Sequence, residues 1–299
     1  MQEINLIADT RKINFNHLLM ASPETANLKM FSIVMATYNC GQKVENTLRS
    51  IFSQNEELFE LIVVDGASTD DTLDCIKKYK SNLTLITEKD NGIFDAFNKG
   101  IDLAGGKYVY FIGAGDCLQS GILEKVKEFL PQEIPAFVYG NCYLMKRKVI
   151  YIGRQSELSD FITDNICQQA IFYHRAIFDI AGKFDLRHKI FADWTFNFEC
   201  FVNQAISKQY IPYLIADYEE GSLSSELDND PPFKKDFPRL IKKHLGTASY
   251  LKCKAFMINP NLYAFSYYAN RALLRHLVSF ARPYVRGYRH LKKVISNKI

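Results

Sequence analysis

The sequence lacks the short patterns that assign many proteins at once. Its 299 residues contain no Cys-x-x-Cys pair, no His-x-x-x-His spacing, no Gly-x-Gly-x-x-Gly fingerprint and no Gly-rich loop ending in Gly-Lys-Ser/Thr. These absences argue against a structural zinc site, a dinucleotide site after the first apolar run and a P-loop nucleotide site. With 47% apolar and 23% charged residues, the composition is still that of a globular protein with a large core.

Cysteine usage argues against secretion. The seven cysteines are scattered along the chain, their number is odd, and no charged-then-apolar leader precedes Ser22. Disulfide-rich secreted domains have the opposite features. We therefore expect reduced, packing cysteines in a cytoplasmic protein.

Acidic residues are missing from the C-terminal end. No Asp or Glu follows Asp236, whereas Lys and Arg continue almost to the last residue, within a net charge of +4. From residue 270 onward, basic and polar residues recur every three to five positions opposite aliphatic ones, as in an amphipathic helix. Arg271 and Arg275 make the run 262–281 too polar to span a bilayer.

This basic segment predicts a peripheral position on an anionic membrane surface, at the inner face of the plasma membrane. We favour a membrane over nucleic acid because aliphatic residues are interleaved with the basic ones. A helix that covers the core with a solvated basic face is the alternative.

Apolar runs alternate with stretches of helical character, which indicates an α/β fold. The runs are continuously apolar, as expected of strands buried on both faces in a mostly parallel sheet flanked by helices. In the first half they cover residues 31–36, 58–64, 83–87 and 108–114. In the second half, strands are predicted near 136–143, 149–153, 170–174 and 210–218, and helices at 93–104, 121–129 and 193–205.

Polar residues follow each of the first four runs. They are Thr37-Tyr38-Asn39, Asp65-Gly66-Ala67-Ser68, Glu88-Lys89-Asp90-Asn91-Gly92 and Gly115-Asp116. Ligands of open α/β sheets bind outside the carboxyl ends of the strands, so these four loops are expected to meet at one ligand.

These motifs, in this order, resemble the family 2 inverting glycosyltransferases with the GT-A fold. The resemblance rests on FSIVMATYN, LIVVDGASTDDT, EKDNGIFDAFNKGI and YVYFIGAGDCL, and it extends through residues 167–185, FADWTF and GSLSSE to about residue 225. Together with the charge and apolar patterns, it divides the chain into four parts: an N-terminal extension (1–30), a nucleotide-sugar-binding half (31–120), an acceptor-binding half (121–230) and the basic helical segment (231–299).

The resemblance also implies roles for residues of the donor site. Thr37 and Tyr38 would lie along the nucleotide, and Asp65 would accept a hydrogen bond from a uracil N–H; capping by Asp65 and packing by Tyr38 are the alternatives. Gly115-Asp116 corresponds to the family's metal loop. Asp116 would therefore hold Mn²⁺ or Mg²⁺ with the donor diphosphate, although glycine replaces the first acid.

Two further positions complete the predicted site. Asp95 and Asn98 share one helix face beside Lys99, and either reach the sugar or diphosphate or form a solvated surface. Asp193 corresponds to the family's catalytic base, although Ala192 replaces a frequent acidic partner. A helix N-cap is the alternative role for Asp193, and Glu199 or Asp185 would then be the next candidates for the base.

We therefore expect a glycosyltransferase that moves a hexose or N-acetylhexosamine from a nucleotide-sugar, UDP-linked by preference, to a saccharide or lipid-linked acceptor of cell-surface polysaccharide synthesis. A nucleotidyltransferase on a related sheet is one alternative, although ATYNCGQK has a single glycine. A non-catalytic nucleotide-sugar binder is the other, favoured by the two replaced acids.

Overall fold

The computed structural model describes residues 28–79, 83–131, 134–151, 153, 157–219 and 230–258. Within these residues the chain alternates strands and helices in its first half, as the sequence predicts. The strands are β1 (Phe31–Thr37), β2 (Phe59–Asp65), β3 (Thr84–Thr87), β4 (Tyr108–Gly113), β5 (Cys117–Leu118), β6 (Ala136–Leu144), β7 (Val149–Tyr151), β8 (Ile171–His174) and β9 (Ser207–Tyr218). The helices are α1 (Lys43–Phe52), α2 (Thr72–Lys77), α3 (Ile93–Leu103), α4 (Ile122–Lys127), α5 (Ile177–Ala181), α6 (Ala192–Val202) and α7 (Pro231–Ile258), with short 3₁₀ turns η3 (Asp160–Ile162) and η4 (Gln168–Ala170).

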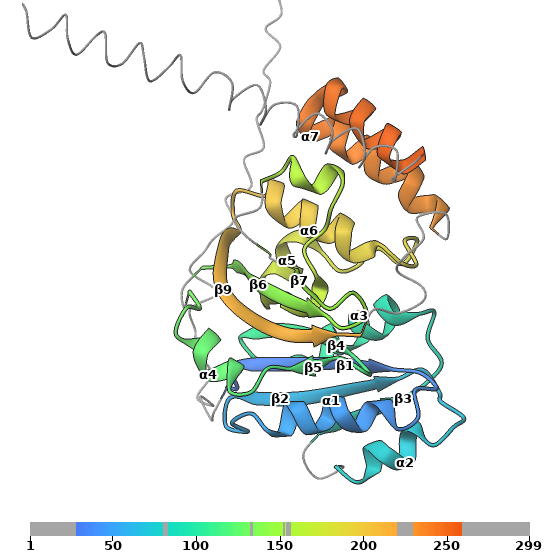
Figure 1. Ribbon diagram of the computed structural model, residues 1–299, viewed down its shortest axis with the longest axis vertical. Helices are drawn as coiled ribbons and strands as arrows, with labels where there is room; N and C mark the ends of the chain where they lie inside the picture. Colours follow the sequence, from blue (N-terminus) through green and yellow to red (C-terminus); the bar gives the residue numbers. More distant parts are fainter. Residues whose placement is uncertain are drawn as a thin grey trace, which may run out of the picture.

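The nine strands of the described residues form one curved sheet in the order β3-β2-β1-β4-β8-β6-β9-β5, with β7 paired to β6 (Figure 1). β1 to β4 are parallel, whereas β8 is antiparallel to both β4 and β6. β9 is parallel to β6 and therefore also to β1 and β4. Parallel pairing thus dominates the first half, and the second half is mixed.

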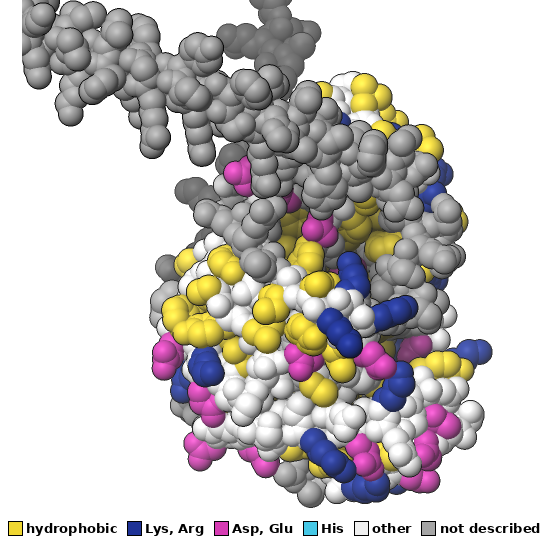
Figure 2. Space-filling view, viewed as in Figure 1, with side chains coloured by type: hydrophobic (Ala, Val, Ile, Leu, Met, Phe, Trp, Pro, Cys, Tyr) yellow, Lys and Arg dark blue, Asp and Glu magenta, His cyan; other side chains and the backbone are white. Residues whose placement is uncertain are grey.

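The sheet is covered on both faces, which explains the continuously apolar strands. Alternate residues of β1 point to opposite faces: Val34 belongs to one buried cluster and Ile33 and Met35 to the other. α3, α5, α6 and α7 cover the first face, and α1, α2 and α4 cover the second. At the α1 and α2 end of the molecule, acidic and basic side chains are interspersed (Figure 2).

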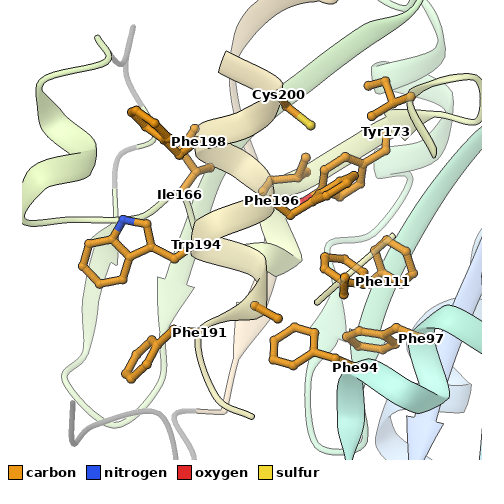
Figure 3. Packing of buried hydrophobic residues seen from close by; sticks show 14 of the residues in the cluster. Phe94, Phe97, Phe111, Ile166, Tyr173, Phe191, Trp194, Phe196, Phe198 and Cys200 are labelled. Carbon is orange, nitrogen blue, oxygen red and sulfur yellow. The ribbon is translucent and has the colours of Figure 1, made fainter. Parts of the chain in front are cut away.

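α6 is buried on opposite sides, so it lies between the sheet and α7. Phe196 packs on Tyr173 of β8, with ring centroids 5.7 Å apart, whereas Trp194 faces away from the sheet (Figure 3). Trp194 contacts Phe233 and Phe237 of α7. The carboxylate of Asp230 accepts hydrogen bonds from the backbone N–H groups of residues 190 and 191 at 2.8 and 3.1 Å, which fixes the start of α7 beside the start of α6.

α7 consists of two helices joined at Gly246, whose φ of 80° and ψ of −178° interrupt the helix. Figure 1 shows the two halves side by side at the end of the molecule opposite α2. The amphipathic pattern predicted from residue 270 onward and the motif GSLSSE lie outside the described residues. No helix within the described residues is long and apolar enough to cross a membrane.

Candidate active site

The predicted site residues lie at one edge of the sheet. The carboxyl ends of β1, β2, β4 and β9 meet there because these strands run in the same direction. β8 runs the opposite way, so its beginning, rather than its end, lies at this edge. The edge therefore collects the residues after four strands and those just before a fifth.

Thr37 and Asp65 lie side by side at the ends of β1 and β2, as paired residues of the ladder. Asp65 Oδ1 accepts hydrogen bonds from Thr37 Oγ1 at 3.0 Å and Ser68 Oγ at 2.5 Å, and Oδ2 accepts one from Ser68 N at 2.8 Å. Asp65 is fully buried. It does not cap the helix that follows, since α2 begins only at Thr72; it fixes the first two loops against each other.

Tyr38 is the large aromatic side chain of this pair of loops and is exposed, with 65% of its surface accessible. Its ring lies against Gly66: a Cβ at that glycine would be 3.2 Å from Tyr38 Cδ2 and 2.7 Å from Asp90 Oδ2. The close approach of an aromatic ring and a carboxylate explains why only glycine fits there. The geometry leaves the ring available to stack on a ligand, so packing into the core is not its role.

The two polar residues predicted on α3 differ in what they contact. Asn98 exchanges two hydrogen bonds with the backbone of Phe184, at 2.9 and 3.0 Å, and thus holds a neighbouring loop. Asp95 Oδ2 accepts hydrogen bonds from the backbone and side chain of Asn91, and it lies 3.9 Å from Lys99 Nζ. Of the two, only Asp95 contacts residues of the loop that follows β3.

Asp116 is buried beside a second carboxylate that the sequence analysis missed. Oδ2 of Asp116 accepts hydrogen bonds from Gly113 N and Gln169 Nε2, and Oδ1 accepts one from Glu219 N at 2.8 Å. Burial raises the pKa of Asp116 to about 7 from its ordinary value of 3.8. The nearby Glu219 carboxylate also raises this pKa, whereas the hydrogen bonds lower it.

Gly115 leaves the space that Glu219 occupies. A Cβ on Gly115 would lie 2.1 Å from Glu219 Oε2, and the backbone has a φ of +105°. The Glu219 carboxylate therefore lies where the side chain of the replaced acid would begin. Its other oxygen accepts a hydrogen bond from Lys43 Nζ at 2.8 Å, which connects the start of α1 to the end of β9.

These carboxylates fit a hard divalent cation. Asp116 and Glu219 supply oxygen ligands of the type that Mg²⁺ and Mn²⁺ prefer. No group of three or more His, Cys, Asp or Glu residues suited to a metal occurs in the part of the chain that the structure describes. A bound cation would thus take most of its ligands from diphosphate and water, as Mg²⁺ commonly does.

Asp193 lies in the first turn of α6 and is partly buried. Phe191, not Asp193, occupies the N-cap position, so the capping alternative is wrong. Asp193 Oδ2 accepts a hydrogen bond from Asn165 Nδ2 at 2.8 Å. Burial raises the pKa of Asp193 to about 7, and the hydrogen bonds from Trp194 N and Asn165 lower it in part.

The two reserve candidates for the base are in less favourable environments. Asp185 forms an ion pair with Arg187 at 2.6 Å, and this hydrogen bond lowers its pKa. Burial raises the pKa of Glu199, which lies six residues beyond Asp193 on α6. Asp193 is the one of the three that accepts a hydrogen bond from the segment before β8.

One segment before β8, residues 163–170, connects Asp116 with Asp193; we call it the bridge segment. Gln169 Nε2 donates to Asp116 at 2.9 Å, and Asn165 Nδ2 donates to Asp193. Between these bonds, Asn197 Nδ2 donates to Asn165 Oδ1 at 3.0 Å. The buried Gln168 Nε2 has no hydrogen-bond partner among the described residues.

The sequence analysis missed Glu219, Lys43, Gln169 and Asn165. Glu219 directly follows a predicted strand, so inspecting the end of that strand like the first four would have found it. The bridge residues precede a strand, and only its antiparallel direction brings them to this edge. Lys43 carries no sequence signal, because its partner is 176 residues away.

Comparisons with known proteins show the family to which the chain belongs. The family model described as Glycosyl transferase family 2 matches residues 32–209. A PGL/p-HBAD biosynthesis glycosyltransferase of Mycobacterium tuberculosis H37Rv is 37% identical over 216 residues, 70% of this chain and 84% of that protein. The UDP-Glc:alpha-D-GlcNAc-diphosphoundecaprenol beta-1,3-glucosyltransferase of Escherichia coli is 33% identical over 126 residues, 41% of this chain and 50% of that protein.

Solved structures share the fold. Staphylococcus aureus TarS 1-349 in complex with UDP-GlcNAc superposes with a TM-score of 0.62 at 20% identity, over 80% of this chain and 73% of that chain. A Pyrobaculum calidifontis mannosyltransferase in complex with GDP-Man and Mn²⁺ gives 0.58 at 18% identity, over 88% and 83% of the two chains. This chain covers 43% of a longer TarS chain.

The fold and the edge of polar loops define a GT-A type glycosyltransferase. The chain belongs to glycosyl transferase family 2, whose relatives are glycosyltransferases of glycan biosynthesis. The nucleotidyltransferase and non-catalytic alternatives are thereby set aside, and the protein is an enzyme.

Proposed function

We propose that the protein is an inverting glycosyltransferase that moves a hexose or N-acetylhexosamine from a UDP-sugar to a hydroxyl of a lipid-linked saccharide. The observation that carries the proposal is the bridge segment. Through Gln169 and Asn165 it holds Asp116 and Asp193, one acid for each end of a displacement reaction.

On the donor side, the first two loops would hold the nucleotide. The exposed Tyr38 ring offers a face for uracil, and Asp65 Oδ2, which accepts one hydrogen bond in the structure, has capacity for a ring N–H. The family relative from E. coli is named for UDP-Glc, and TarS was solved with UDP and UDP-GlcNAc. We therefore favour UDP over the GDP carrier of the mannosyltransferase.

Asp116 and Glu219 would hold Mn²⁺ or Mg²⁺ at the diphosphate. When bound, the cation neutralises the charge that develops on the leaving group. Lys43, which pairs with Glu219 in the structure, would then be released to contact a phosphate oxygen. Asp95, in the first turn of α3, contacts the loop after β3 and would lie toward the sugar.

On the acceptor side, Asp193 would act as general base. Its carboxylate takes the hydroxyl proton while the acceptor oxygen bonds to the anomeric carbon, and the bond from that carbon to UDP breaks with its electron pair on the leaving oxygen. A base with a pKa near 7 is well matched to neutral pH. Attack opposite the leaving group inverts the anomeric configuration.

A lipid-linked acceptor is supported by the names of two relatives. One belongs to PGL/p-HBAD biosynthesis, and the other acts on a GlcNAc-diphosphoundecaprenol. The acceptor class is proposed on that basis, as is a position at a membrane.

The proposal is tested in two steps. A thermal-shift panel of UDP-, GDP- and dTDP-sugars with Mn²⁺ identifies the donor, because a ligand that binds the native state stabilises it. Transfer to short lipid-linked saccharides is then followed by UDP release, and the anomeric configuration of the product is read by NMR. Stabilisation by GDP-sugars alone would refute UDP as the carrier. A product with the same anomeric configuration as the donor would refute the inverting mechanism.

A further inference from the structure

A basic groove lies between the two halves of α7, away from the sheet edge described above. It has a volume of about 440 Å³. Its first wall carries Lys234, Lys235 and Arg239, and its second carries Lys254 with the ring of Tyr250. Lys235 and Arg239 are four residues apart, as are Tyr250 and Lys254, so each wall is one face of a helix.

Basic residues far outnumber acidic ones in the sequence of α7. Asp236 is the one acidic residue in the sequence of α7, and no acidic residue follows it in the chain. Its carboxylate already pairs with Arg187 at 3.1 Å and lies 3.7 Å from Arg239. A hollow lined by several cationic side chains has a positive potential and attracts anions.

Exposed apolar side chains accompany the basic ones on the second half of α7. Leu251 and Ile258 are 61% and 77% exposed, and they lie seven residues apart on the helix face that also carries Lys254. Aliphatic residues next to cations are typical of helices at a membrane interface, where the cations contact phosphates and the aliphatic side chains enter the acyl region. A site for a small soluble anion has no need of them.

The groove is also on the acceptor side of the molecule. Phe233 and Phe256, each next to a groove residue in sequence, pack on Trp194, which follows Asp193 on α6. Asp230 connects the first turn of α7 to the backbone just before α6. A membrane bound by α7 would therefore be held on the helix that packs directly against α6.

We propose that the groove between the halves of α7 binds the phosphate of an anionic membrane lipid, with Leu251 and Ile258 inserted among the acyl chains. This site lies in described residues and does not depend on the transfer chemistry.

Co-sedimentation of the full-length protein with phosphatidylglycerol vesicles tests the proposal. Each basic side chain near an anionic surface contributes about fivefold in affinity, equivalent to about 1 kcal/mol. The triple variant Lys235→Gln/Arg239→Gln/Lys254→Gln should therefore bind these vesicles with about 100-fold lower affinity than wild type.

The matched control removes three positive charges at the opposite end of the molecule, with Lys77→Gln, Lys125→Gln and Lys127→Gln. These lysines lie on α2 and α4, which Figure 1 shows well away from α7. The control should bind vesicles almost as wild type does. An equal loss of vesicle affinity in both variants would show that net charge alone attracts the protein to the membrane. This result would refute the groove as the lipid site.

A second variant, Leu251→Ser with Ile258→Ser, separates a lipid from a soluble anion. It keeps every charge but should lower vesicle affinity by roughly tenfold, since the apolar contribution to insertion is lost. Unchanged vesicle binding by this variant would refute the insertion of Leu251 and Ile258 among the acyl chains. Calorimetric binding of inorganic phosphate or duplex DNA that depends on the same three basic residues, and not on Leu251, would assign the groove to a soluble anion or to nucleic acid instead. Retained UDP binding shows that each variant is folded.

Discussion

Replacing Asn165 by leucine should raise the pKa of Asp193. In the structure Asn165 Nδ2 donates to Asp193 Oδ2 at 2.8 Å, and this bond opposes the burial that raises the pKa to about 7. A hydrogen bond to a charged group contributes about 1.5–3 kcal/mol, and one pKa unit corresponds to about 1.4 kcal/mol. Removal of the donor should therefore raise the pKa by about one unit or more.

The consequence depends on pH. If Asp193 is the base, the enzyme needs its deprotonated form, so a rise from about 7 to about 8 lowers the active fraction about eightfold at pH 6.5 and hardly at all at pH 9. The assay is the pH dependence of kcat/KM from UDP release. Carboxyl ¹³C NMR of Asp193 measures the same pKa directly and needs no acceptor.

Asn197→Leu is the matched control. Both substitutions break the 3.0 Å hydrogen bond between Asn197 and Asn165, and both should cost about 1–3 kcal/mol of stability by leaving a buried amide group unpaired. Only Asn165→Leu removes the donor to Asp193. Coincident pH profiles for the two variants, or an unchanged Asp193 pKa in Asn165→Leu, would refute the reasoning.

Four further predictions concern the same site. Asp193→Asn should lose about 10² to 10⁴ in turnover while UDP affinity, measured by calorimetry, stays the same; near-normal turnover would exclude it as the base. Asp116→Ala should abolish the Mn²⁺ dependence of UDP binding, and Glu219→Gln should weaken it, so wild-type calorimetric titrations for either variant would contradict its role. Gly115→Ala should unfold at lower urea than wild type because its Cβ would lie 2.1 Å from Glu219 Oε2 and its φ is +105°; an unchanged midpoint would show that the loop adapts. The native state binds the Asp193 proton more tightly than the unfolded state, so unfolding free energy should fall as pH rises from about 4 to 7, and Asp193→Asn should flatten that fall in urea titrations.

The α/β order of the chain and the polar loops after β1, β2 and β4 could be predicted from the sequence. Strands such as β1 and β2 are buried on both faces, so their apolar runs are continuous and their ends are marked by the polar residues Thr37 and Asp65. Because parallel strands place their carboxyl ends at one edge, these residues could be grouped without knowledge of the structure. The four motifs that follow the first strands, taken in their order, were sufficient to indicate the family.

The groups that surround each acid could not be predicted from the sequence, because they come together only when the chain folds. Strand direction in the second half is not encoded locally, and the reversal of β8 places Gln169 and Asn165 beside Asp116 and Asp193. Gly115 stands where the family has an acidic residue, and its neighbours in sequence do not show which group occupies that space. Glu219 occupies it from the end of β9, more than 100 residues later in the chain. The raised pKa values have the same origin: burial is a property of the packed structure, and a carboxylate in a sequence carries no sign of the atoms that will remove its water.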